Sequence, residues 1–294
     1  MRAFASLRSV LVAAATAALV AVGAAAPASA QQLQLPAPIA PSFRLPSLLK
    51  SQGCKSEYLI AVPGGVNTMP GLPRNLPHGG NVWLTGVLTQ LYTGGQIQPL
   101  WIAYDAAPFA TTQYQTASNR GYAETKKAVA GIANACPNAR FSFTGYSLGA
   151  DIVSRMLNNI AHDRGPIAKE RVASAALFSS PYQGGNGAVM SAGTSPHVRG
   201  ALGELEGGYG DLGERVLEIC NTGDIVCSPS ENQREIVDPA MDVNLSSGGM
   251  PRWVIDIARA NDGRTSSIIH SIGAHGSYTL AQQHEAANWI ANHR

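Results

Sequence analysis

The chain has 294 residues, of which 45% are hydrophobic and only 14% are charged, with 21 lysines and arginines against 19 aspartates and glutamates. That composition is typical of a well-packed globular protein that tolerates export. The near balance of charge argues against nucleic acid as a partner, because nucleic-acid-binding domains carry a clear basic excess.

Residues 1–30 predict a secretory signal peptide. Arg2 and Arg8 give a charged start, residues 10–22 an apolar middle, and Ala28-Ser29-Ala30 a cleavage site of small residues. The alternative, an uncleaved membrane anchor, is disfavoured because the apolar middle is short and rich in alanine. Cleavage after Ala30 removes two arginines and leaves 19 basic against 19 acidic residues, so the mature chain is formally neutral.

The rest of the chain divides into a short leading segment and one domain. Residues 31–50 carry four prolines among apolar residues without clear periodicity. This predicts an extended linker or surface strap over residues 31–53. Residues 54–294 show no internal repeat and no second domain boundary, so we expect a single domain.

Within residues 54–294, apolar strands alternate with helical patterns, which is typical of a parallel α/β sheet buried on both faces. Five strands are expected, at residues 57–62, 97–104, 140–144, 172–178 and 215–219. Helices are expected at residues 84–91, 122–135, 148–160 and 277–294.

Two further segments are predicted to be mainly loops. Residues 182–213 are rich in glycine, and residues 244–263 are loop-like around a possible helix at 251–260. Long loops in a compact domain often carry function, so these are the natural places for an element that covers a substrate.

The strongest chemical signal is Gly145-Tyr146-Ser147-Leu148-Gly149, which lies between a predicted strand and a predicted helix. This is the context of a nucleophile elbow, a strained turn that holds the serine Oγ clear of the sheet. A side chain at either glycine would collide with the neighbouring strand or helix, and the helix start offers free N–H groups to a developing negative charge. The alternative is a glycine-rich turn that contains serine by chance. The flanking elements favour the catalytic interpretation.

A serine nucleophile needs a base, and an acid that orients the base. In α/β folds both follow the serine along the chain, on loops at the carboxyl ends of strands. Asp224 follows the fifth predicted strand and lies between Cys220 and Cys227. A disulfide there would hold the carboxylate in place. The ordinary alternative is an aspartate in a Gly-Asp turn.

The four cysteines should pair in a secreted chain, and they allow three connectivities. The short interval between Cys220 and Cys227 favours that pair, which leaves Cys54 with Cys136. The second bond would then join the start of the domain to the strand that leads to Ser147.

Four histidines follow Asp224 and could serve as the base. His284 and His293 belong to the predicted terminal helix and are expected at the surface. His275 is expected on a loop just before that helix, and it is favoured. His270 follows two isoleucines, fits a buried or strand residue equally well, and is the alternative.

Taken together, these motifs resemble the cutinase family. They are Cys136-Pro-Asn-Ala followed by Gly-Tyr-Ser-Leu-Gly-Ala, then Cys-x-x-x-Asp-x-x-Cys around Asp224, then His-x-x-Tyr from His275 to Tyr278. The likeness points to the secreted cutinase-like serine esterases and lipases of mycobacteria and related actinobacteria, and it extends from Cys54 to the C-terminus.

The resemblance implies a single α/β-hydrolase domain with a central five-stranded parallel sheet flanked by helices. It also implies disulfides Cys54–Cys136 and Cys220–Cys227 and a triad of Ser147, Asp224 and His275. The backbone N–H groups of Gly65 and Leu148 would form the oxyanion hole. The family commonly has glutamine at position 148 and serine or threonine at position 65, so here only backbone donors would remain.

The sequence therefore predicts a secreted or envelope-associated serine esterase or lipase that acts through an acyl-enzyme, without a metal or an organic cofactor. By the resemblance, its substrates would be fatty-acyl esters, phospholipids or acyl thioesters of the cell envelope. The alternative is a weak or inactive hydrolase-fold binding protein, which the altered residues at 65 and 148 motivate. Retention of the serine, the acid, the histidine and both cysteine pairs weighs against it.

Overall fold

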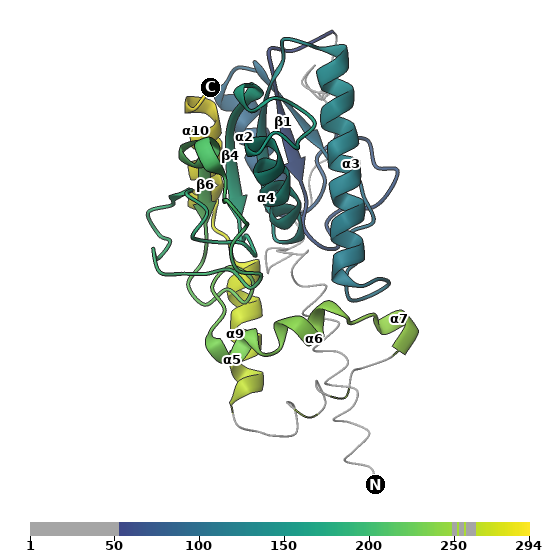
Figure 1. Cartoon of the computed structure of the whole chain (residues 1–294), viewed down its shortest axis with the longest axis vertical. Helices are drawn as coiled ribbons and strands as arrows, with labels where there is room; N and C mark the ends of the chain where they lie inside the picture. Colours follow the sequence, from purple (N-terminus) through teal and green to yellow (C-terminus); the bar gives the residue numbers. More distant parts are fainter. Residues whose placement is uncertain (1–52, 249–251, 253–255, 257–262) are drawn as a thin grey trace, which may run out of the picture.

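The computed structural model describes residues 53–248, 252, 256 and 263–294 (Figure 1). The predicted signal peptide, the predicted linker except for its last residue, and most of the possible helix at 251–260 lie outside the described residues. In the part that is described, no helix combines the length and the apolar content needed to cross a membrane.

A six-stranded parallel sheet forms the centre of the molecule, with strand order β2-β1-β3-β4-β6-β5. Its strands are β1 (Glu57–Val62), β2 (Ile97–Trp101), β3 (Arg140–Tyr146), β4 (Val172–Phe178), β5 (Val189–Met190) and β6 (Val216–Ile219). The expectation of a parallel α/β sheet flanked by helices is confirmed.

The expected number of strands was wrong, because β5 adds a sixth inside the segment 182–213 that reads as loop. Val189 and Met190 pair with Leu217 and Glu218 of β6 at one edge of the sheet. A strand of two residues is too short to show alternation, so periodicity does not mark it within the glycine-rich segment.

Four long helices cover the sheet, two on each face (Figure 1). The pair α3 (Tyr114–Ala135) and α4 (Leu148–Ala161) lies on one face, and the pair α2 (Asn81–Tyr92) and α10 (Leu280–Asn292) lies on the other. All four were expected, although α3 begins eight residues before its predicted start because its first two turns are mostly polar.

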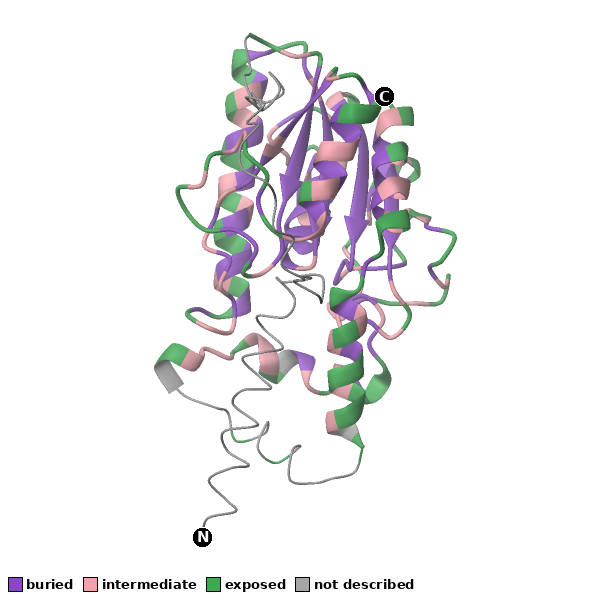
Figure 2. Ribbon diagram, turned by 180° about the vertical axis from the view of Figure 1, so that it is seen from behind, coloured by how far each residue is buried: buried purple, intermediate pink, exposed green. Residues whose placement is uncertain are grey.

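Alternate residues of β1 show why both faces are apolar. Tyr58, Ile60 and Val62 pack into the core beneath α3 and α4, whereas Leu59 and Ala61 pack into the core beneath α2 and α10. Every residue of β4 is buried as well. Burial of the sheet between two helical layers is visible in Figure 2.

The strands end at the edge of the sheet that faces α5 (Glu231–Arg234), α6 (Val237–Met241), α7 (Leu245–Gly248) and α9 (Arg264–Gly276) (Figure 1). The chain near α7 is attached to the turn before α3, since Leu245 N–H donates to Phe109 O at 2.8 Å. The segment 244–263, expected to be loop-like, thus begins with a short helix. The residues that follow the strands meet at this edge, where a site is expected in an open α/β sheet.

Candidate active site

Ser147 occupies a sharp turn between β3 and α4. Its backbone has φ 55° and ψ −119°, a combination that residues other than glycine rarely adopt. A Cβ atom at Gly145 would lie 2.5 Å from the carbonyl oxygen of Gly149, and one at Gly149 would collide with the carbonyl oxygen of Val62 in β1. Both glycines are therefore required by packing, as the motif predicts. The turn leaves Ser147 partly exposed at the sheet edge.

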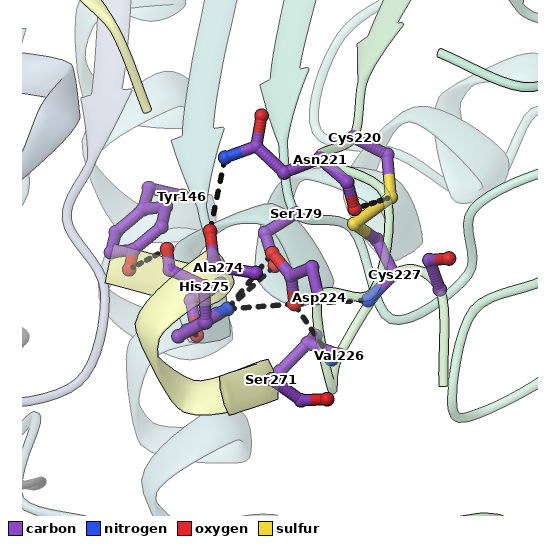
Figure 3. Close-up of polar contacts among 12 residues, drawn as sticks. Tyr146, Ser179, Cys220, Asn221, Asp224, Val226, Cys227, Ser271, Ala274 and His275 are labelled. Atoms are coloured by element: carbon purple, nitrogen blue, oxygen red, sulfur yellow. Dashed lines mark hydrogen bonds and ion pairs between the residues drawn. A yellow bond between two sulfur atoms is a disulfide. The ribbon is translucent and has the colours of Figure 1, made fainter. Parts of the chain in front are cut away.

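The three side chains predicted to act together do meet. His275 Nε2 lies 3.0 Å from Ser147 Oγ, and His275 Nδ1 lies 3.0 Å and 3.1 Å from the two carboxylate oxygens of Asp224. These distances are within hydrogen-bonding range of a nucleophile, its base and the group that orients the base. Figure 3 shows the histidine and the carboxylate facing one another below the strand ends.

Asp224 is fully buried, and both of its carboxylate oxygens accept hydrogen bonds. Its Oδ1 accepts the Val226 N–H at 2.7 Å and its Oδ2 accepts the Tyr278 hydroxyl at 2.7 Å. Burial alone would raise the pKa of Asp224. The opposing effects of His275 and of these two donors outweigh burial, so the pKa lies below its ordinary value. The carboxylate is thus held ionised beside the imidazole.

His275 is in a different element from the one expected. It lies in the last turn of α9, not on a loop before the terminal helix, and it shares a buried face with Ser271 one turn earlier. The prediction missed this helix because Gly273, Gly276 and Ser277 around the histidine are typical of a loop.

His270 also lies on α9, and its side chain is exposed. The expectation of a buried or strand residue was wrong there. Five residues along a helix correspond to about 140° around its axis, so His270 and His275 project from different faces. The alternative base is not part of the cluster around Ser147.

Both disulfides pair as expected, Cys54 with Cys136 and Cys220 with Cys227. The second bond closes the loop that carries Asp224. Within this loop Asn221 donates through Nδ2 to the carbonyl oxygen of Ala274 at 3.0 Å, next to His275 (Figure 3). The loop that bears the acid is therefore tied directly to the end of the helix that bears the base.

The two predicted oxyanion donors belong to the residue that follows the nucleophile and to the turn that follows β1. Leu148 is the first residue of α4, and its side chain is buried in the core, so only its backbone faces the turn. Gly65 follows β1 in a turn that packs closely on the elbow, since a Cβ atom at the neighbouring Gly64 would lie 2.8 Å from Cδ1 of Tyr146. The Tyr104 hydroxyl fixes this turn by donating to Pro63 O at 2.5 Å.

Three residues near His275 had no role assigned from the sequence. Tyr146 donates through its hydroxyl to His275 O at 2.9 Å and stacks on the imidazole with ring centroids 5.1 Å apart. Ser179 Oγ lies 2.9 Å from His275 Nδ1, and Tyr278 donates to Asp224. Ser179 could have been found by the rule that located Asp224, because it directly follows the buried strand β4.

The described residues include no cluster of three or more histidine, cysteine, aspartate or glutamate side chains able to hold a metal ion. The arrangement of hydroxyl, imidazole and buried carboxylate can remove a proton from Ser147 Oγ and can stabilise the imidazolium that results. The chemistry that such a set supports is nucleophilic acyl transfer.

Comparisons with known proteins point the same way. A family model described as Cutinase matches residues 74–237, more than half of the chain. The "Carboxylesterase Culp6 homolog" of Corynebacterium glutamicum is 25% identical over 224 residues, covering 66% of this chain and 72% of that protein. A "Cutinase" of Blumeria hordei is 27% identical over 121 residues, covering 41% of this chain and 39% of that protein.

Among solved structures, lysin B from Mycobacteriophage D29 matches with 20% identity and a TM-score of 0.48, covering 82% of this chain and 92% of that one. The family model carries the assignment, because it spans the elbow, the strand β4 and the disulfide loop with Asp224. With its serine elbow and its carboxylesterase relative, the chain belongs to the cutinase family and is a serine carboxylic ester hydrolase.

Proposed function

We propose that Ser147, His275 and Asp224 form the catalytic triad of a secreted esterase that acts through an acyl-enzyme. The observation that carries the proposal is the position of His275, which is within 3.0 Å of Ser147 Oγ through one ring nitrogen and within 3.0 Å of Asp224 through the other. The Gly65 and Leu148 N–H groups would form the oxyanion hole.

In the proposed reaction, His275 Nε2 accepts the Ser147 hydroxyl proton while Oγ attacks the ester carbonyl carbon. The two backbone N–H groups stabilise the oxyanion, and Asp224 stabilises the imidazolium. The imidazolium gives its proton to the leaving alcohol as the ester bond breaks. Water then attacks the acyl-enzyme with His275 as its base, which releases the carboxylic acid and restores Ser147.

We further propose that the enzyme acts on fatty-acyl esters outside the cytoplasm, with phospholipids and acyl thioesters as further substrate classes. The predicted signal peptide over residues 1–30 supports export, and two disulfides suit an oxidising compartment. Residues 54–294 would form the exported catalytic domain, with residues 31–53 as a linker that could keep it close to the cell envelope.

The test uses the mature protein from Gln31 onward with intact disulfides and a series of p-nitrophenyl esters of increasing acyl length. Ser147→Ala, Asp224→Asn and His275→Ala should each lower kcat by roughly 10⁴-fold or more. His270→Ala is the matched control, because it removes a histidine from the same helix without touching the cluster. The acyl length with the highest kcat/KM would define the acyl pocket.

Labelling by a fluorophosphonate provides a second readout that does not depend on choosing the right ester. The wild type should be labelled and Ser147→Ala should not. A wild type that turns over no ester and takes no label would contradict the proposed mechanism and favour a binding protein. Parallel assays with a phospholipid and an acyl thioester would separate the substrate classes.

A further inference from the structure

Ser179 adopts a backbone conformation that costs free energy. It directly follows β4 and has φ 52°, which places it in the left-handed region that favours glycine. Its side chain is fully buried, and its N–H donates to Ile219 O at 3.0 Å. A strained residue at a site persists where the surrounding structure holds it, and such residues gather where a side chain must be aimed.

The side chain is aimed at the imidazole of His275. Ser179 Oγ lies 2.9 Å from His275 Nδ1, at least as close as either carboxylate oxygen of Asp224 (Figure 3). In the tautomer that the proposed triad requires, Nδ1 carries the single ring hydrogen, and both the carboxylate and the serine oxygen are close enough to accept it. The Ser179 hydroxyl proton remains available to the Tyr278 hydroxyl, with which it also interacts. The contact therefore gives Nδ1 an oxygen partner in addition to the carboxylate of Asp224.

We propose that Ser179 is a positioning residue that holds the His275 ring in the tautomer and orientation that keep Nε2 against Ser147 Oγ. The inference rests on the proposed triad and adds a second fixed oxygen at Nδ1. The proposed role also explains why this position holds serine. Glycine would adopt the positive φ without strain, but it would lack the oxygen that contacts Nδ1.

Two substitutions separate the hydroxyl from the backbone. Ser179→Gly removes the hydroxyl and relieves the left-handed strain, whereas Ser179→Ala removes the hydroxyl and keeps the strain. Both should lower kcat by about tenfold with KM unchanged, since Ser179 is buried and acts through His275. The glycine variant should nevertheless melt about 2–4 °C above the alanine variant.

Asp163 offers a matched control for the backbone effect. It is another residue of positive φ, at 58°, and it is exposed beyond the far end of α4, about 20 Å of helix away from Ser147. Asp163→Gly and Asp163→Ala should show a similar difference in melting temperature between them, with kcat equal to that of the wild type.

The decisive comparison is made in the His275→Ala background, where adding Ser179→Gly should leave the residual rate unchanged. If His275→Ala lowers kcat as expected while Ser179→Gly keeps wild-type kcat, the positioning role is overturned and the triad stands. If kcat in the two Ser179 variants follows their stability, or if KM changes in place of kcat, the role is also overturned. If His275→Ala retains full activity, the proposed triad itself fails.

Discussion

The Tyr278 hydroxyl donates to Asp224 Oδ2 at 2.7 Å and also contacts the sulfur of Cys227 at 3.4 Å. The tyrosine thereby joins the buried carboxylate to the disulfide loop that carries it. Its ring packs edge-on against Phe178 at the end of β4, with centroids 5.6 Å apart. One side chain thus connects the acid, the disulfide and the end of the central sheet.

Tyr278→Phe should lower kcat by about tenfold while the ring packing is kept. Loss of the hydroxyl removes a donor from a buried carboxylate, so the pKa of Asp224 should rise and its support of the imidazolium should weaken. Tyr58→Phe is the matched control, because the Tyr58 hydroxyl contacts the sulfur of Cys136 at the other disulfide. Steady-state kinetics and thermal melting of both variants test this, and an unchanged kcat in Tyr278→Phe would contradict it.

The two disulfides should differ in how much they contribute to stability and to catalysis. Cys54–Cys136 spans 82 residues and Cys220–Cys227 spans 7, which correspond to about 4.5 and about 2.5 kcal/mol of unfolding free energy on the chain-entropy model. Replacing both members of the first pair by alanine should cost more stability but leave kcat near that of the wild type.

Replacing Cys220 and Cys227 by alanine should cost less stability but lower kcat, because Asp224 accepts N–H bonds from residues of that loop. Urea unfolding and ester turnover, both measured well below the melting temperature, distinguish the two effects. A variant without the short disulfide that keeps wild-type kcat would show that the loop holds its shape without the bond.

Much of the site could be expected from the sequence because its signals are local. Ser147 lies in a turn whose two glycines are required by contacts within a few residues or with the adjacent strand. Asp224 follows a strand and is bracketed by cysteines. Both positions follow from patterns that span fewer than ten residues, and the strands that lead to them are almost entirely buried.

Neither the helix that carries His275 nor the contact of Ser179 with that histidine could be predicted from local sequence patterns. The last turn of α9 contains Gly273 and Gly276, and it is held through contacts such as the one between Asn221 and Ala274, 53 residues apart. Ser179 meets His275 across 96 residues. Such contacts exist only once the sheet edge has formed, so neither propensity nor periodicity reveals them.

Glu218 is a buried carboxylate that the proposed mechanism does not use, and it should make stability depend on pH. It lies in β6, accepts the Gly184 N–H at 2.9 Å and the Tyr209 hydroxyl at 3.2 Å, and is fully buried. Burial raises its pKa from 4.5 to about 7, although these two donors and the charge of Arg199 oppose the rise.

Because the pKa is higher in the folded state, the stabilising contribution of Glu218 is fully present below pH 4.5 and is lost as the pH rises through about 7. Between about pH 5.5 and about pH 8 the wild type should lose about 2 kcal/mol of unfolding free energy through this group. Glu218→Gln keeps the shape and can still accept the Gly184 N–H, so it should remove that loss. Glu214→Gln, at an exposed position, controls for the change in net charge. Urea unfolding across this pH range measures both variants, and equal slopes for Glu218→Gln and the wild type would contradict the prediction.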